Sequence, residues 1–180
     1  MINEEKRMKT RYILAFAICC ITTLTALVAC SVSYKFNGAS IDYTQTKTIT
    51  ISDFPIRATY VWGPMQSIFN NRLKDVYAQQ TRLSQVKKGG DLKVEGEITQ
   101  YQQRNKSVSA DGYSAQTELS MTVNVRFTNN KNHTQDFERS FTATATYEST
   151  RSLNSVQEQL VTEMTKDICD QIFNATVANW

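Results

Sequence analysis

The sequence is poor in the residues that define several special classes of protein. Of its 180 residues only two are proline and six are glycine, which excludes collagen-like and low-complexity chains. Four cysteines are too few for a disulfide scaffold. Disorder is not expected, because basic and acidic side chains nearly balance, at 20 and 17, and aromatic residues make up 10%. The chain is therefore expected to form one or at most two ordinary domains.

Histidine is scarcer still, and its scarcity removes whole classes of active site. His133 is the single histidine and lies in an Asn-rich turn, so neither a Ser-His-Asp triad nor a multi-histidine metal site can be built. No dinucleotide or phosphate-loop pattern occurs, and Gly89-Gly90 is typical of a turn. Glu95 and Glu97 fall on the polar side of a predicted strand, which favours a solvated sheet face over a glycosidase pair. We therefore expect no enzymatic activity, no cofactor and no metal.

No apolar run is long enough for a membrane-spanning helix, but the longest one lies near the N-terminus. A charged, mainly basic segment at 4–11 precedes nine apolar residues at 13–21, which lead into a threonine-rich stretch. A spanning helix needs about 20 continuous apolar residues, and Thr22 interrupts this run. A basic segment followed by a short apolar run is typical of a secretory signal peptide. We predict that this segment is cleaved rather than retained as a membrane anchor. Translation from Met8 instead of Met1 would give a tidier signal, and the sequence leaves both starts open.

The signal ends in a pattern that is typical of bacterial lipoproteins. Leu27-Val28-Ala29-Cys30 resembles the lipobox, with leucine at position minus three and a small residue at minus one. In lipoproteins the cysteine becomes the first mature residue and carries a diacylglyceryl group and an amide-linked acyl chain. Several acyl chains anchor a protein stably without a membrane-spanning helix. No acidic residue follows within 31–36, and the resemblance therefore implies the periplasmic leaflet of the outer membrane.

Removal of the signal changes the charge and the cysteine count. The signal holds four basic and two acidic residues, so residues 30–180 keep 16 and 15, a formal net charge of +1. No footprint for nucleic acid remains. Only Cys30 and Cys169 are left, and because Cys30 is expected to carry lipid, no intramolecular disulfide is expected. Cys169 lies at the core boundary of a predicted helix and is interpreted as a structural thiol.

Alternation of apolar and polar residues predicts the strands. Strict alternation over 113–128 predicts a long half-buried strand. It resumes from Phe137 to Tyr147 after an Asn-rich turn, which makes a hairpin. Arg139 is out of step, because its parity points it to the apolar side unless a bulge or an edge position relieves it. Two further strands are expected, at 92–101 and 47–54.

Two amphipathic segments predict helices. One begins at Pro64 and keeps apolar residues on one face as far as Tyr77. The other opens with a capping-box pattern at 155–158. The order β-α-β-β-β-α predicts an α+β fold, a two-layer sandwich in which both helices pack on one face of a four-stranded, mainly antiparallel sheet. The predicted organisation is a cleaved signal peptide, a lipidated tether and a single domain, at residues 1–29, 30–46 and 47–180.

Two surface features exceed what a generic domain needs. The polar side of the sheet is rich in Thr, Ser, Asn and Gln, although ordinary strand surfaces share this chemistry. In addition, Phe173, Val177 and Trp180 lie well off the core stripe of the last helix. Either the helix ends before Phe173 and the tail folds onto the core, which we favour, or the three side chains form an exposed patch for a partner.

Short motifs along the mature chain add a second resemblance. They are Tyr34, Phe36, Gly38 and Ser40-Ile41; Lys47-Thr48-Ile49, Ile51 and Phe54-Pro55; Asp91-Leu92, Glu95-Gly96-Glu97-Ile98 and Tyr101; Val125-Arg126-Phe127-Thr128-Asn129; and Ile172-Phe173-Asn174 with Val177-Ala178-Asn179-Trp180. Together they resemble the lipopolysaccharide (LPS)-assembly lipoprotein family LptE over nearly the whole mature chain. In that family the lipoprotein sits inside the lumen of a large outer-membrane barrel, LptD, assists its assembly and helps deliver LPS to the cell surface.

The resemblance implies a non-enzymatic plug, assembly factor and LPS-binding subunit, with the barrel, LPS and the membrane as partners. A barrel interior is polar, so a Thr- and Ser-rich sheet surface suits a plug, and basic side chains suit the phosphates of lipid A. The strand and loop pattern offers four candidates for LPS contact: Arg126, Lys131, Arg104 and Lys106. The alternative is a periplasmic ligand-binding or adaptor lipoprotein of another envelope complex, or a surface glycan-binding lipoprotein, although the missing acidic export signal argues against a surface protein.

Overall fold

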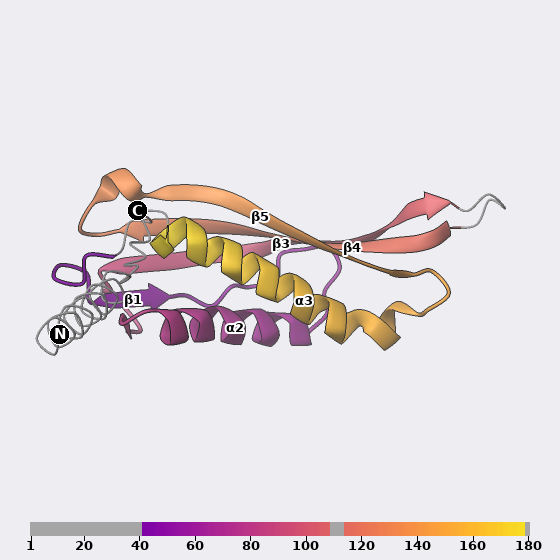
Figure 1. Cartoon of the computed structure of the whole chain (residues 1–180), viewed down its shortest axis with the longest axis horizontal. Coiled ribbons are helices and arrows are strands. Elements are labelled where there is room, and N and C mark those ends of the chain that lie inside the picture. Colours follow the sequence, from indigo (N-terminus) through magenta and orange to yellow (C-terminus); the bar gives the residue numbers. More distant parts are fainter. Residues whose placement is uncertain (1–40, 109–113, 179–180) are drawn as a thin grey trace, which may run out of the picture. The chain divides into compact units, whose positions relative to one another are not determined.

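The computed structural model describes residues 41–108 and 114–178, which are coloured in Figure 1. The predicted signal peptide, Cys30, most of the predicted tether and Trp180 lie outside the described residues. The elements in chain order are β1 (Thr48–Ile51), α2 (Pro64–Gln80), β2 (Ser84–Gln85), β3 (Leu92–Val108), β4 (Ser114–Asn129), the short 3-10 helix η1 (His133–Gln135), β5 (Phe137–Glu148), α3 (Leu153–Phe173) and the π-helical turn η2 (Asn174–Ala178).

The strands of the described residues form one mixed sheet of five, in the order β2-β1-β3-β4-β5. β1 pairs in parallel with β2 on one side and β3 on the other, whereas β3, β4 and β5 pair antiparallel. Parallel neighbours need a long crossover connection, and α2 lies in the chain between β1 and β3. α2 and α3 lie side by side against one face of the sheet (Figure 1). The predicted α+β fold with two helices is confirmed.

The prediction of four strands in a mainly antiparallel sheet is wrong in part. β2 consists of two exposed residues, Ser84 and Gln85, which is too short for any alternation to be read. β1 runs parallel to its neighbours, and the period of a strand carries no information on the direction of its pairing. The observed sheet is therefore larger and more mixed than the sequence pattern indicates.

Two bulges in β3 interrupt its alternation. The register of β3 against β4 shifts between Ile98 and Gln100, and again after Asn105. Ile98 and Tyr101 consequently both face the core, at 0% and 3% exposure, although their positions differ in parity. A strand with such a shift has no continuous period of two. This is why β3 continues to Val108, past the end that alternation predicts.

β4 has the clean alternation that the sequence predicts. Its core-facing side chains are all at most 1% exposed, and they are Leu119, Met121, Val123, Val125 and Phe127. They belong to one buried cluster with the apolar stripe of α3, which includes Leu160, Val161, Met164 and Ile168. Full burial of such a side chain contributes about 1.5–3 kcal/mol. Burial of these side chains in the common core therefore supplies much of the stability of the sandwich.

Buried amide side chains connect the two layers. Asn70 on α2 accepts a hydrogen bond from the backbone N–H of Phe54 at 2.8 Å and donates to the Phe54 carbonyl at 3.4 Å. Gln157 on α3 donates from Nε2 to the hydroxyl of Tyr101 on β3 at 2.9 Å. A buried polar group that loses its partner costs stability. Each pair therefore favours one position of its helix over the sheet.

α3 begins earlier than its sequence pattern predicts. The helix starts at Leu153, with Ser152 at the N-cap position, and Ser152 makes no side-chain cap bond. Ser155, the predicted cap, lies inside the first turn, where its hydroxyl donates to the Ser152 carbonyl at 2.8 Å. The predicted capping box is therefore wrong, because a serine in the first turn can bond backwards within the helix.

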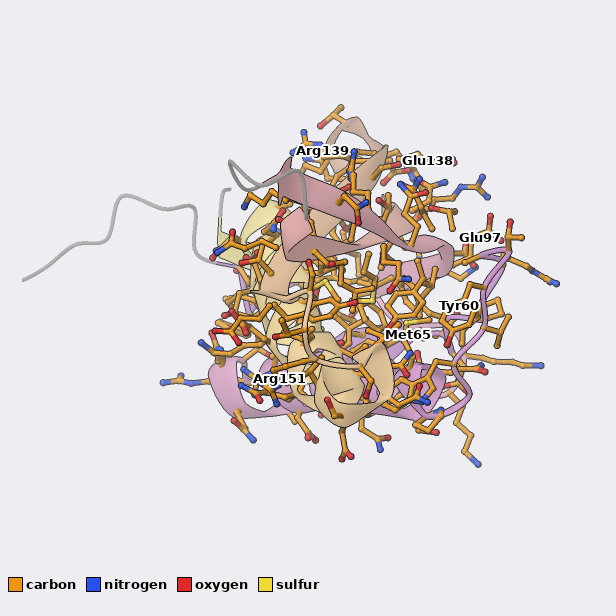
Figure 2. The ribbon with its side chains drawn as sticks, turned by 90° about the vertical axis from the view of Figure 1, so that its right-hand side faces the viewer. Tyr60, Met65, Glu97, Glu138, Arg139 and Arg151 are labelled. Atoms are coloured by element: carbon orange, nitrogen blue, oxygen red, sulfur yellow. The ribbon has the colours of Figure 1, made fainter. Side chains whose placement is uncertain are left out.

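The edge position of β5 explains Arg139. β5 is the outermost strand of the described sheet, so a side chain on its core-facing side can still reach solvent. Arg139 is exposed, and its guanidinium carbon lies 5.5 Å from the centre of the Phe137 ring. Figure 2 shows Arg139 at the margin of the molecule, whereas Met65 lies in the interior.

Candidate functional site

The face of the sheet opposite the helices carries polar side chains from three strands. The β5 members are exposed, and they are Glu138, Ser140, Thr142, Thr144 and Thr146. The β4 members alternate with the core residues, and they are Glu118, Ser120, Thr122, Asn124 and Arg126. The β3 members pair with those of β4, and they are Glu95, Glu97, Gln100, Gln102 and Arg104. These fifteen residues are termed the open face.

Hydrogen bonds across the strands hold the centre of the open face. The Thr122 hydroxyl on β4 donates to Gln100 Oε1 on β3 at 3.2 Å and lies 2.9 Å from the Thr142 hydroxyl on β5. Because the Thr122 hydroxyl proton is used in the bond to Gln100, the Thr142 hydroxyl donates in the bond between the two threonines. Such cross-strand pairs each contribute a fraction of a kcal/mol up to about 1 kcal/mol. The face is therefore ordered by its own side chains while most of them remain in contact with solvent.

Arg126, a predicted LPS contact, is held by a carboxylate on the neighbouring strand. Its Nε and a terminal nitrogen donate to Glu138 Oε2 at 3.1 and 2.9 Å, and Asn124 donates to Glu138 Oε1 at 3.0 Å. The hydrogen bonds from Asn124 and Arg126 hold the pKa of Glu138 below its ordinary value, and Glu138 raises the pKa of Arg126. Because both groups are exposed, the pair contributes little to stability.

The structure does not bring the four predicted LPS contacts into one site. Arg104 and Lys106 on β3 share one carboxylate, Glu118, at 3.1 and 3.9 Å. Arg126 lies eight residues along β4 from Glu118, which corresponds to about 26 Å at the rise of a strand. Lys131 lies farther still, in the turn after β4. The candidates therefore form two separate groups at opposite ends of the long strands.

A basic pocket lies at the end of the sheet where β3 begins. Its volume is about 490 Å³, and it is lined by Thr50, Ser52, Lys87, Lys88, Gly89, Gly90, Lys93 and Asn130. Lys93 pairs with Glu95 at 2.7 Å. Among residues 41–108 and 114–178, no carboxylate forms an ion pair with Lys87 or Lys88. These two ammonium groups therefore carry charge that the described chain does not neutralise.

The loop that carries Lys87 and Lys88 is fixed by its glycines. Gly89 has φ of 73°, a conformation that glycine adopts without steric cost. The Gly90 N–H donates to the Thr50 hydroxyl at 3.0 Å, and the Gly90 carbonyl accepts from Asn130 Nδ2 at 2.7 Å. A side chain at position 90 would lie 2.6 Å from the Thr50 nitrogen. The glycine pair therefore presses the loop onto β1 and holds the pocket in shape.

Lys131 approaches this end of the sheet but is held by Asp91. Its ammonium lies 3.0 Å from Asp91 Oδ1, while Asp91 Oδ2 accepts from the backbone N–H groups of Lys47 and Thr48 at 2.9 and 3.0 Å. The hydrogen bond from the Lys47 backbone and the one from Lys131 hold the pKa of Asp91 well below its usual range. Asp91 therefore ties the start of β1 to the turn after β4.

Sequence reasoning missed Lys87, Lys88 and Lys93 as a group. Lys87-Lys88 is the one pair of adjacent basic residues in the chain after Cys30, and it directly precedes Gly89-Gly90. That pattern could have indicated an anion-binding loop, but the contribution of β1 and of Asn130 depends on tertiary contacts. The sequence therefore shows the lysines, but it does not show that they line a pocket.

The predicted partner patch at the C-terminus is wrong for the two members that the structure describes. Val177 is 5% exposed, and Phe173 is half-buried with its ring edge-on to Tyr77 at 5.5 Å between ring centres. The Tyr77 hydroxyl is hydrogen-bonded to that of Thr176, and burial raises the pKa of Tyr77. The tail thus packs onto the core, as the favoured alternative predicts, but the helix does not end before Phe173: α3 includes Phe173 and continues as η2, and the π-helical turn brings Val177 to the buried side. Trp180 lies outside the described residues.

The remaining thiol is part of the core. Cys169 on α3 is 0% exposed, and burial raises its pKa to about 12, which makes it an inert structural thiol. Within 41–108 and 114–178, no group of three His, Cys, Asp or Glu side chains is arranged to hold a metal ion. None of the described helices is both long and apolar enough to cross a membrane.

Several solved structures are similar to this chain at low sequence identity. A hypothetical protein of Chlamydia trachomatis is 9% identical, with a TM-score of 0.51 over 72% of this chain and 97% of that one. Lipoprotein B of Nitrosomonas europaea is 20% identical, with a TM-score of 0.48 over 71% and 79% of the two chains. Rare lipoprotein B of Shewanella oneidensis is 15% identical, with a TM-score of 0.48 over 70% and 92%.

The comparison with protein families is more specific. No curated protein matches the chain. The family described as LptE, lipopolysaccharide-assembly, matches residues 46–176. This match covers all the helices and strands of the structure from β1 through α3, and it agrees with the motifs that the sequence shows. The chain belongs to the LptE family of lipopolysaccharide-assembly proteins.

Proposed function

We propose that this protein is an outer-membrane lipoprotein that plugs an LptD-type barrel, assists its assembly and binds LPS, without enzymatic activity. Membership of the LptE family supports this role. The lipobox at Cys30 supports a lipid anchor, and the absence of an acidic residue close behind it supports the periplasmic leaflet of the outer membrane. The anchor would keep the domain at the membrane surface where a barrel opens.

The open face is the observation that carries the proposal of a plug. The interior of an outer-membrane barrel is polar and hydrated, so a protein seated there must offer hydrogen-bonding groups without exposing its core. The open face presents serine, threonine, asparagine and glutamine side chains that are already ordered by bonds such as Thr122 to Thr142. Ordered polar groups lose little conformational entropy when they bind. We therefore assign this face to contact with the barrel.

Affinity purification from detergent-solubilised envelope tests the proposal. We expect a large barrel to copurify with the full-length lipoprotein in stoichiometric amount. Thr144→Trp would place a bulky side chain on the open face and should reduce recovery of the barrel without lowering the melting temperature. The matched control is Ser67→Trp, which replaces another small hydroxyl side chain at an exposed position of α2. Absence of any barrel from the wild-type purification would contradict the proposal and favour an adaptor of another envelope complex.

The basic pocket supports LPS binding, with Arg126, Lys131, Arg104 and Lys106 as the other candidates. Phosphate groups bind most strongly where cationic donors are not already neutralised, and Lys87 and Lys88 meet this condition. Their loop is also fixed by Gly89 and Gly90, so the site needs little reorganisation. The pocket therefore ranks above the paired residues as a site for the phosphates of lipid A.

A double substitution tests this ranking. Lys87→Ala with Lys88→Ala should weaken binding of purified LPS by about tenfold or more, since charge-assisted hydrogen bonds are stronger than neutral ones. Lys166→Ala, at an exposed position of α3, provides a lysine control that should leave binding unchanged. Equal binding by the double variant and the wild type would remove the pocket from the proposal.

A further inference from the structure

β3 has a free edge along its second half. On the side away from β4, β1 pairs with Leu92 to Val94, and Ile56 forms an isolated bridge with Ile98. Beyond Ile98, no described residue pairs with β3 on this side. Between its two bulges, residues 100–105 remain regular, a length typical of a whole strand. An unpaired edge of this length is a template for another strand.

The direction of the backbone groups on this edge follows from the register. The Val94 carbonyl accepts a hydrogen bond from the Ser52 N–H. The Ile98 N–H donates to the Pro55 carbonyl, and the Ile98 carbonyl accepts from the Arg57 N–H. The N–H and C=O groups of the core-facing residues of β3 therefore point away from β4. Side-chain direction and hydrogen-bonding direction alternate together along a strand. After the bulge, the core-facing residues are Tyr101 and Gln103, opposite Met121 and Leu119. Their N–H and C=O groups therefore point to the free edge.

A groove runs beside this edge. Its volume is about 880 Å³, and it is lined by Thr59, Tyr60, Thr99, Gln100, Tyr101, Gln102, Gln103, Leu119 and Leu153. Tyr60 stacks on Tyr101 with ring centres 5.5 Å apart and an angle of 13° between the rings. Figure 2 shows Tyr60 at the side of the molecule, on the segment that leads into α2. An added strand could therefore form hydrogen bonds with the free backbone groups of β3 and contact the rings of Tyr60 and Tyr101.

One exposed apolar residue, Tyr60, lines the groove, and another, Val61, follows it in the chain. Tyr60 and Val61 are 47% and 57% exposed, and they are the large apolar side chains that remain exposed among residues 41–108 and 114–178. One exposed aliphatic or aromatic side chain alone is common on protein surfaces. The exposed ring of Tyr60, stacked on Tyr101 beside a free strand edge, provides an apolar contact for a side chain of an added strand, the combination used in β-strand addition.

The charges along the edge indicate the partner. Arg104 and Lys106 share the single carboxylate of Glu118, which leaves one positive charge in excess. Pairing between two copies of this edge would set four basic side chains against two carboxylates, an arrangement that like-charge repulsion disfavours. A strand that brings an aspartate or glutamate near Arg104 and Lys106 removes the excess. The edge therefore suits an acidic extended segment better than a second copy of the chain.

We infer that the free edge of β3 at 100–105 binds an extended segment of the barrel partner, which adds as a strand with an apolar side chain toward Tyr60 and an acidic side chain toward Arg104. This inference rests on the proposed function for the identity of the partner. It adds a backbone-directed contact to the side-chain contacts of the open face, and the two surfaces meet along β3.

A pair of substitutions at Gln103 isolates the backbone contact. Gln103→Pro removes the N–H group that points to the free edge, and proline is tolerated on strand edges. Gln103→Ala removes the same side chain, including its bond from the Tyr147 hydroxyl at 3.0 Å, but keeps the N–H. We expect the proline variant to weaken binding of the purified barrel by about five- to tenfold relative to the alanine variant, the effect of one lost hydrogen bond.

Hydrogen exchange on the wild-type complex provides a second readout that needs no variant. In the barrel complex the amides within 99–106 should exchange more slowly than in the free lipoprotein at the same pH. Copurification of the barrel with unchanged exchange at 99–106, or with equal binding of the two Gln103 variants, would overturn the inference and leave the plug proposal standing. Absence of any barrel would overturn the plug proposal itself. Protection of 99–106 in the free protein at high concentration would assign the edge to self-association and overturn the inference.

Discussion

Alternate residues of β4 lie on two faces of the sheet that are held in place by different interactions. On the core face, side chains such as Met121 and Val123 are 0% exposed and are held by apolar contacts with the helices. On the open face, Thr122 and Asn124 are held by hydrogen bonds to the neighbouring strands and remain partly exposed. The core face therefore determines stability, whereas the open face is ordered at little energetic gain and stays available for a partner.

The largest expected effect lies on the core face. Met121→Ala should lower the free energy of unfolding by about 2–5 kcal/mol, because it removes a buried side chain and leaves a cavity in the core. Urea denaturation measures the change. A loss below about 1 kcal/mol would show that the core at β4 is loosely packed and that stability comes from elsewhere in the sandwich.

Asp91, which is partly enclosed at the end of the sheet, should contribute more to stability than the exposed polar groups of the open face. Asp91→Asn should lower the free energy of unfolding at neutral pH by about 1–3 kcal/mol, because it weakens bonds to the Lys47 backbone and to Lys131. The folded-state pKa of Asp91 is depressed, so its contribution is complete above about pH 4 and is lost as the pH falls further. The stability difference between wild type and variant should shrink below about pH 4. A constant difference down to about pH 2 would contradict this assignment.

Thr122→Ala is the matched substitution on the open face. It removes the bonds to Gln100 and Thr142 and should cost about 1 kcal/mol or less, since these groups can bond to water instead. Set beside Met121→Ala in the same denaturation series, it compares adjacent residues on opposite faces. Equal losses for the two variants would break the distinction between the faces.

Arg126→Glu should change stability least, because the Glu138 pair that it breaks is exposed. The melting temperature should stay nearly constant, while binding of purified LPS should fall if Arg126 contacts a phosphate. The fall should be smaller than that of the Lys87 and Lys88 double variant, because Glu138 already neutralises Arg126. Unchanged LPS binding would return Arg126 to the ordinary sheet surface.

The elements that the sequence predicts well are those with an unbroken period. β4, β5 and α2 follow regular alternation or a regular helical stripe, and their ends agree closely with the prediction. Irregular backbone defeats the same reasoning. The bulge after Ile98 hides the second half of β3, two residues are too few to reveal β2, and a serine that bonds backwards displaces the start of α3.

The sequence predicts which kinds of side chain the candidate site contains better than it predicts where these side chains lie. Alternation correctly assigns Thr, Ser and Asn to one face of the sheet, because that face is set by the period alone. The basic residues are different, since Arg104 and Arg126 lie on one face but far apart along it. Lys87 and Lys88 approach Asn130 only through the pairing of β1 with β3 and the bond from Asn130 to Gly90, and neither can be read from local sequence.

The central claim is that the open face contacts a barrel, and cysteine accessibility tests it most directly. Thr144→Cys on the open face and Ser67→Cys on α2 place single thiols at exposed positions, while Cys169 is buried with a pKa of about 12 and stays silent. A water-soluble maleimide should label both variants when the lipoprotein is free. In the purified barrel complex, the account predicts strong protection of the cysteine at 144 and much weaker protection of the one at 67. Equal labelling at 144 in the free and complexed protein would contradict it.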